Sequence, residues 1–175
     1  MAKQVVIGED ATGRTNTRIS EIELKPLGGG FRYSQLWGSD EIPSFPNDGT
    51  PPVYGPLYPG PNGYRFMLMS LLPAQSLSPD DSGPVEIDEG MQKLLEDAGI
   101  SSAAAGDAPG MHRTDTVDLG MVVSGTLILE LDSGEMIELH AGDSFIQNGA
   151  NHNWHNPGST PATLIVALIG GHPRD

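Results

Sequence analysis

The second half of the chain is a run of short apolar stretches separated by glycine-bearing turns. From residue 111 onward the stretches TLILEL, EMIELH and ATLIVALIG follow one another closely, and DSGE at 132–135 is a hairpin signal. Short strands at close spacing, with turn residues between them, are typical of antiparallel β-sandwiches and β-barrels. The 23 glycines and 15 prolines among 175 residues favour the same all-β class over a helical bundle.

Four stretches in the first half predict further strands. QVVI at 4–7, ISEIEL at 19–24 and FRYSQLW at 31–37 are short and partly alternating, and YRFMLMSLLP at 64–73 is strongly apolar. We therefore expect an N-terminal part, residues 1–63, whose strands and loop pack on a β-barrel formed by residues 64–175. The two parts together make one structural domain of ordinary size.

Two segments interrupt the strand pattern. Residues 43–63 hold too many prolines and glycines for a helix or a central strand. Their aromatic residues Phe45, Tyr54 and Tyr58 predict that this loop packs over something, either as a pinned surface loop or as the lid of a pocket. Residues 85–100 have apolar side chains at helical spacing and a glycine near the end, and predict one short amphipathic helix inserted in the barrel.

Charge and cysteine content exclude several classes of function. The formal net charge of −14 disfavours nucleic acid and anionic membranes as partners. No apolar run reaches the length of a membrane-spanning helix, and the N-terminus does not read as a secretory signal, so we expect a cytoplasmic protein. Without cysteine, a bound metal must be held by histidine, carboxylate or neutral oxygen.

Polar residues alternate just before the apolar run that begins near residue 119. His112, Thr114, Thr116 and Asp118 are two residues apart, so an extended chain places them on one face. Donors, acceptors and a carboxylate on one face indicate either a surface open to water or the lining of a polar cavity.

These residues also fit the first motif of the cupin family, G(X)5HXH(X)3-4E(X)6G. His112 takes the place of the first histidine, Thr114 that of the second, Asp118 that of the glutamate and Gly125 that of the closing glycine. The aspartate is one methylene shorter than glutamate, and the threonine hydroxyl is a weak metal ligand.

The second cupin motif, G(X)5PXG(X)2H(X)3N, follows at the expected distance. Gly142 opens it, Gly149 and His152 take the glycine and histidine places, and Asn156 ends it, while Gln147 stands where the family has proline. The chain therefore resembles a small cupin with an extended N-terminal half over about residues 65–170.

The resemblance implies a jelly-roll antiparallel β-barrel with its site in the lumen, and often a homodimer. It implies that His112, Asp118 and His152 are the catalytic residues and the ligands of a divalent transition metal, Fe(II) first, with Mn, Ni or Zn as alternatives. Thr114, Gln147 and Trp154 are candidate substrate-binding residues, although Trp154 could instead fill the core. His140, His155 and His172 are expected outside the site.

The function that follows is a metal-dependent enzyme acting on a small organic molecule. An oxidoreductase of the dioxygenase kind, or a metal-assisted decarboxylase or isomerase, fits this ligand set. Two metal-free alternatives remain open. One is a cupin that binds a small ligand without catalysis, and the other is an acid–base epimerase or dehydratase in which His112 or His152 carries the proton.

Overall fold

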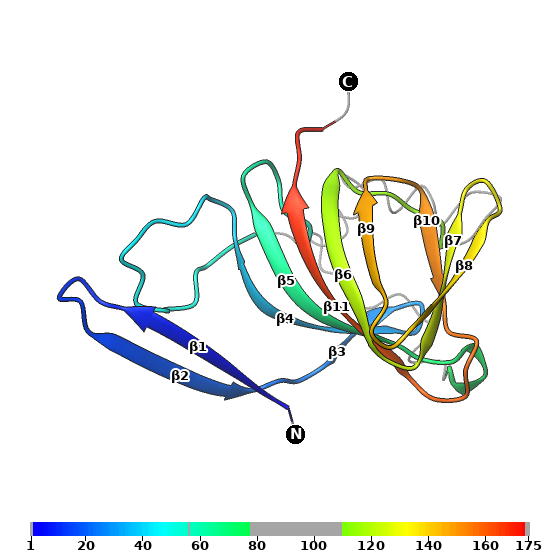
Figure 1. Ribbon diagram of the computed structural model, residues 1–175, viewed down its shortest axis with the longest axis horizontal. Coiled ribbons are helices and arrows are strands. Elements are labelled where there is room, and N and C mark those ends of the chain that lie inside the picture. The colour runs from blue at the N-terminus through cyan, green and yellow to red at the C-terminus, as the bar shows by residue number, and fades with distance from the viewer. Residues whose placement is uncertain (1, 56, 78–109, 174–175) are drawn as a thin grey trace.

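The computed structural model describes residues 2–55, 57–77 and 110–173, which form an antiparallel all-β structure (Figure 1). A short 3₁₀ turn at Ala74–Ser76 is the helical element of this described part. The strands are β1 (Lys3–Glu9), β2 (Thr15–Glu21), β3 (Lys25–Gly28), β4 (Phe31–Ser39), β5 (Tyr64–Leu71), β6 (Thr116–Ser124), β7 (Thr126–Leu131), β8 (Met136–His140), β9 (Ser144–Asn148), β10 (His152–His155) and β11 (Ala162–Gly170).

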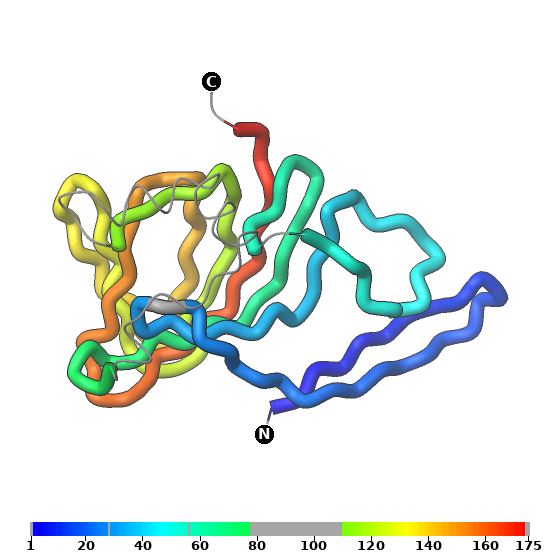
Figure 2. The backbone as a smooth tube through the Cα atoms, turned by 180° about the vertical axis from the view of Figure 1, so that it is seen from behind, coloured from blue at the N-terminus to red at the C-terminus, as the bar shows by residue number. Residues whose placement is uncertain are grey.

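The strands form three antiparallel sheets. A six-stranded sheet has the order β3-β4-β5-β11-β6-β9, and a three-stranded sheet has the order β10-β7-β8. These two sheets enclose the interior of the molecule, whereas the β1–β2 hairpin extends away from them (Figures 1 and 2). The fold class predicted from the sequence, an antiparallel jelly roll, is confirmed.

The two larger sheets do not close into a continuous hydrogen-bonded barrel. In the described residues, the two sheets share no strand pairing, and the segment before β6 reaches β10 through an isolated bridge between His112 and His152. Instead of the closed barrel that the sequence predicts, the structure has two facing sheets. The bridge between His112 and His152 joins their polar parts.

Alternating residues of β11 explain how the interior is built. Leu164, Val166 and Leu168 are buried and pack with Val122 of β6 and Leu127 of β7 in one apolar cluster. The intervening residues of β11 face the other side of the sheet, because successive side chains of a strand alternate. Polar residues two apart on β6 therefore point into the same interior as this core.

The loop at 43–63 is held on the sheet from one side. Tyr58 packs against the core and the Tyr54 ring lies 4.7 Å from the guanidinium carbon of Arg65. Phe45, in contrast, is 85% exposed, so the loop packs on the sheet through Tyr54 and Tyr58 and not through this residue.

The turn and strand predictions have mixed outcomes. DSGE is the hairpin turn between β7 and β8, with Gly134 at a φ of +82° that favours glycine. The strand predicted at 19–24 begins earlier and ends at Glu21. The helix predicted at 85–100 lies outside the described residues, and within those residues no helix is long and apolar enough to cross a membrane.

Candidate active site around a histidine pair

Two histidines from separate parts of the chain meet inside the molecule. The backbone of His112, before β6, exchanges two hydrogen bonds of 2.9 Å with the backbone of His152, at the start of β10. The two imidazole rings lie against each other as a result, with centroids 4.3 Å apart and planes tilted by 49°. The structure thus brings together two of the three predicted catalytic residues, although 40 positions separate them in the sequence.

Backbone carbonyls fix the tautomer of both rings. The Nδ1 atom of His112 lies 2.9 Å from the carbonyl oxygen of Gly110, and that of His152 lies 3.0 Å from that of Ala150. A carbonyl oxygen only accepts hydrogen bonds, so each Nδ1 carries the proton and each Nε2 keeps a lone pair. Metal-binding histidines present Nε2 to an ion in this way, with the other ring nitrogen donating its proton to a carbonyl or carboxylate oxygen.

Burial keeps both imidazoles neutral. It lowers the pKa of His112, and it lowers the pKa of His152 to about 4, with the neighbouring His112 adding to the effect. Near neutral pH the pair therefore offers lone pairs rather than positive charge.

A chain of hydroxyl groups leads to the predicted carboxylate. The Thr114 hydroxyl lies 2.7 Å from that of Thr116, which donates a hydrogen bond of 2.6 Å to Asp118 Oδ1. All three side chains are buried on the same face of the chain, as the alternation predicted. Burial raises the pKa of Asp118 to about 6, although the hydrogen bond from Thr116 opposes the rise.

Asp118 is separate from the histidine pair. No ion pair joins its carboxylate to either imidazole, and no group of three or more His, Asp or Glu side chains in the described residues is placed to hold a metal ion. The two imidazoles fit a divalent transition metal in donor chemistry and tautomer. The role of Asp118 as a third ligand stays a prediction.

Gln147 connects the two sheets inside the site. It lies on β9 opposite Asp118 and is 7% exposed. Its amide nitrogen is 2.5 Å from Nδ1 and 3.2 Å from Nε2 of His152, and its amide oxygen is buried without a hydrogen-bond partner. Because Nδ1 carries its proton, a half-turn of the amide replaces this contact between two donors with a hydrogen bond from Nδ1 to the amide oxygen. The predicted substrate-binding roles of Gln147 and Thr114 remain predictions; Gln147 contacts His152, and Thr114 contacts Thr116.

Trp154 has contacts that explain it as a core residue. It packs against the apolar cluster, and its ring centroid is 4.9 Å from that of Phe145. The Phe145 ring in turn lies over Gly120, where a Cβ atom would come within 2.1 Å of it. The ring of Trp154 also meets His152 edge-on at 6.3 Å, so its predicted contact with a ligand remains open as a prediction.

The other histidines are outside the site, as expected. His155 points away from the interior and its Nε2 lies 2.6 Å from Glu130 Oε2, while His140 is exposed beside Glu138. The motif residue Asn156 is structural, because its amide donates to the carbonyl oxygens of Leu71 and Thr160, each at 2.8 Å.

Sequence analysis missed one neighbour of Asp118. Burial raises the pKa of Tyr58 and the charge of Asp118 adds to the rise, so the proline-rich loop brings this phenol to the Asp118 side of the interior. The sequence signal was present in the aromatic residues of the loop, but it gave no indication of which of them would face the site.

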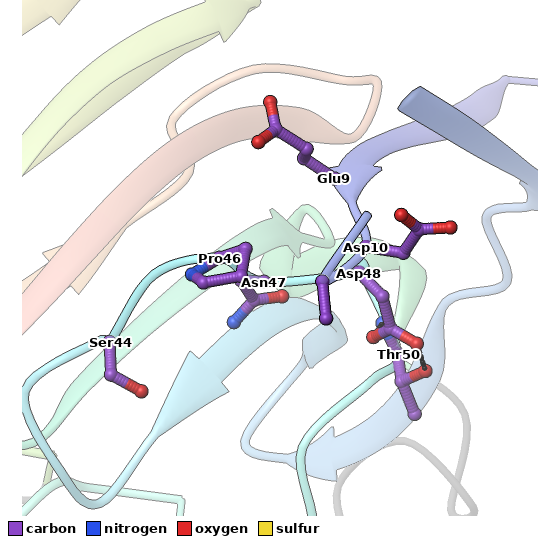
Figure 3. A pocket seen from close by; sticks show the side chains of 8 residues that line it. Glu9, Asp10, Ser44, Pro46, Asn47, Asp48 and Thr50 are labelled. Carbon is purple, nitrogen blue, oxygen red and sulfur yellow. Dashed lines mark hydrogen bonds between the residues drawn. The ribbon is translucent and has the colours of Figure 1, made fainter. Parts of the chain in front are cut away.

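A hollow lies between the β1–β2 hairpin and the proline-rich loop, and neither histidine of the pair lines it. It is lined by acidic and polar residues that include Glu9, Asp10, Asn47 and Asp48 (Figure 3). Both aspartates accept hydrogen bonds within their own turns, Asp10 from Thr12 and Asp48 from Thr50. Their carboxylates are therefore engaged in local turn structure.

The comparisons with known proteins agree with the geometry. The cupin-domain family model matches residues 100–168. "Oryzines biosynthesis cluster protein J" of Aspergillus oryzae is 47% identical over 65 residues, which are 36% of each chain. "Cupin-domain-containing oxidoreductase virC" of Hypocrea virens is 36% identical over 66 residues, which are 36% of this chain and 34% of the relative.

These matches span about a third of the length of the curated relatives. Among solved structures, the polyketide cyclase RemF of Streptomyces resistomycificus superposes with a TM-score of 0.47 at 12% identity, covering 88% of this chain and 78% of that one. The match to the family model therefore identifies residues 100–168 as a cupin domain, and the two motifs agree with it.

Proposed function

We propose that this chain is a metal-dependent cupin enzyme, most closely of the oxidoreductase kind, that acts on a small organic molecule beside the His112–His152 pair. The observation that carries the proposal is the shared tautomer of two adjacent, neutral imidazoles. The relatives named cupin-domain-containing oxidoreductases support the reaction class.

His112 and His152 would hold a divalent transition ion, Fe(II) first. Such an ion supplies Lewis acidity toward substrate oxygens and, if it is iron, a centre for oxidation by dioxygen. The protein's own groups would bind and orient the substrate: the Thr114 and Thr116 hydroxyls offer hydrogen bonds, and Asp118 can hold a proton on its carboxyl near neutral pH. The partly buried rings of Trp154 and Phe145 pack beside His152 and would form the apolar side of the site.

Metal content tests this proposal directly. The full chain, without an affinity tag, is loaded with Fe(II), Mn(II), Co(II) or Zn(II), passed through a desalting column and analysed for bound metal. We expect near-stoichiometric metal in the wild type and in His140→Ala, which removes an exposed histidine, and its loss in His112→Ala and His152→Ala. Metal retained by both site variants, or absent from a folded wild type, contradicts the proposal.

Asp118, whose carboxyl forms no ion pair with the two histidines, favours a second candidate function, that of a metal-free acid–base enzyme. A buried carboxyl that is linked through two hydroxyls to the neighbourhood of two neutral imidazoles can take up and release a proton near neutral pH. A metal-free wild type that catalyses an epimerisation or dehydration, with activity lost in Asp118→Asn, would support this candidate.

The expected homodimer remains part of the proposal. The outer face of the six-stranded sheet carries a row of exposed apolar side chains in register, Phe66 on β5, Leu119 on β6 and Ile146 on β9, which a second copy could cover. Sedimentation of the wild type and of Ile146→Glu tests it, with a shift to monomer expected in the variant.

A further inference from the structure

The β1–β2 hairpin has one face against the rest of the chain and one face open to solvent. On the first face a Cβ atom at Gly8 would come within 2.0 Å of the backbone of Asp48, so the proline-rich loop lies directly on this strand. The backbone N–H of Glu9 donates to the carbonyl oxygen of Asn47 at 2.7 Å, and the Gln4 amide donates to a backbone carbonyl of β4. The hairpin is therefore held in a fixed position where it projects from the two larger sheets (Figure 1).

The other face, which we call the open face of the hairpin, is apolar at its centre. Val5, Ile7 and Ile19 are 48%, 68% and 66% exposed, and Val5 lies opposite Ile19 in the register of the two strands. The charged residues of this face lie at the ends of the hairpin, with Lys3 opposite Glu21 at one of them. A two-stranded hairpin is only marginally stable by itself in water, so one that projects with an apolar face is expected to pack on another surface.

The outer face of the six-stranded sheet is a second apolar surface, and its four strands β5, β11, β6 and β9 give it no charge. Arg65 and Asp118 are the charged residues of these strands, and both are buried on the inner face. Antiparallel sheets usually carry polar side chains on the face opposite the core. Here that face instead has five exposed large apolar side chains, those of Phe66, Leu119, Met121, Ile146 and Ile169.

The net charge of −14 favours a second copy of the chain as the partner of both surfaces. A nucleic acid or an anionic membrane is repelled by this charge, and a basic partner is attracted to the acidic surface rather than to an uncharged one. Two copies of the chain attract each other only where both present uncharged apolar surfaces. The seven-residue strands of the hairpin are about 23 Å long, enough to cross the four strands of the outer face, which lie about 4.8 Å apart.

We propose that the open face of the hairpin of one copy lies over the outer face of the six-stranded sheet of a second copy. This inference rests on the homodimer of the proposed function and identifies the segment that forms its contact. Because the hairpin projects beyond its own sheets (Figure 2), the contact is made twice across a twofold axis, and each copy gives its hairpin and receives that of the other. The apolar centres of both surfaces are then buried, and the charged ends of the hairpin lie at the rim of the interface.

Photo-cross-linking tests which surfaces meet. The chain contains no cysteine, so a single introduced one is a unique site for a benzophenone maleimide. Thr17→Cys, opposite Ile7 on the open face, is labelled and irradiated, and the covalent dimer is isolated and mapped by mass spectrometry. We expect its cross-links on the outer face of β5, β11, β6 or β9. Ser20→Cys, on the other face of β2, is the matched control and should give none there.

Sedimentation equilibrium measures how much the hairpin contributes. We expect Ile7→Glu to weaken dimerisation at least tenfold, because the substitution places a carboxylate at the centre of the open face. Val53→Glu, at a fully exposed apolar residue of the proline-rich loop outside both surfaces, should leave the dissociation constant unchanged. Circular dichroism of each variant establishes that it is folded before the dissociation constants are compared.

The outcomes separate this inference from the proposed function. Cross-links that join hairpin to hairpin, or that lie on the three-stranded sheet, overturn the inference. A wild-type dissociation constant in Ile7→Glu also overturns it, and if Ile146→Glu then dissociates the dimer, the homodimer stands without the hairpin. A wild type that is monomeric overturns both the inference and the homodimer. None of these results changes the metal content expected of the wild type, on which the proposed enzyme function is tested.

Discussion

Arg65 and Asp118 are two buried charged residues in one row of the same sheet, with opposite surroundings. Leu168 on β11 is the cross-strand partner of Arg65 on one side and of Asp118 on the other. Arg65 is 0% exposed and Asp118 is 8% exposed. The comparison sets a buried charge that serves the structure beside one that the proposed chemistry would use.

The Arg65 guanidinium is fully engaged. It donates to Asp40 Oδ1 at 2.5 Å and to the carbonyl oxygens of Ser39 and Tyr64 at 2.8 and 2.9 Å. Asp40 also accepts the backbone N–H of Gly55 at 2.8 Å. This group of contacts holds the end of β4 and the proline-rich loop on the sheet, and so has a structural role.

Asp118 has no such set of partners. Its carboxylate accepts from Thr116, and Leu168 lies between it and Arg65, so no cation of the described chain pairs with it. A buried charge with all its partners stabilises one geometry, whereas burial without a cation raises the pKa of the Asp118 carboxyl to about 6, so that it can exchange a proton in mildly acidic solution. We place function at Asp118 and its neighbours for this reason.

Replacing Arg65 should give the largest effect. Arg65→Met leaves Asp40 without its cation and two carbonyls without donors, and we expect a loss of about 3–5 kcal/mol in the free energy of unfolding. Urea denaturation measures it. Arg18→Met, at an exposed pair with Asp48, should cost less than about 1 kcal/mol. If Co(II) affinity falls in folded Arg65→Met, the division between a structural and a functional charge is wrong.

Replacing Asp118 should act in the opposite direction. Burial raises the pKa of Asp118 from 3.8 to about 6, so the folded state holds its proton more tightly than the unfolded state and stability falls as pH rises from 3.8 to 6. Asp118→Asn removes this penalty. Above pH 6 we expect the metal-free variant to gain about 2–3 kcal/mol in the free energy of unfolding. A loss of stability there would show that Asp118 has a cationic partner.

Asp118→Asn should also reveal how His152 changes the free energy of unfolding with pH, because Asp118 and His152 have opposite effects on it. Burial lowers the pKa of His152 from 6.5 to about 4, so the unfolded state binds the proton first and stability falls as pH drops from 6.5 to 4. In the wild type the slopes from Asp118 and His152 oppose each other between pH 4 and 6. Asp118→Asn should therefore show a steeper acid loss than the wild type, measured by denaturation at several pH values.

Features that depend on residues close together in the sequence could be predicted from it. Alternation placed Thr114, Thr116 and Asp118 on one face, because that depends only on the two-residue period of a strand. The two motifs predicted His112 and His152 as members of one site, and the structure brings their rings together. Short apolar stretches and glycine turns located most of the strands.

What could not be predicted depends on pairing between distant strands. That Gln147 lies opposite Asp118 follows from the register of β6 with β9, and its contact with His152 depends on how β10 lies across the interior. The pair of Arg65 with Asp40 was hidden as well, because an arginine within YRFMLMSL reads as a polar interruption of an apolar strand. No periodicity indicates which carboxylate will neutralise it.

The smallest predicted effect concerns the hydroxyl chain beside Asp118. Thr116→Val removes the hydrogen bond that lowers the pKa of Asp118, so that pKa should rise further, with a change of about 1 kcal/mol in stability. Thr114→Val removes the outer hydroxyl but leaves Thr116 to donate, and should leave the pKa of Asp118 unchanged. Carboxyl ¹³C chemical shifts, followed against pH in the metal-free protein, measure both. Equal titration of Asp118 in the two variants would mean that Thr116 does not act on the carboxylate, and that burial alone sets its proton affinity.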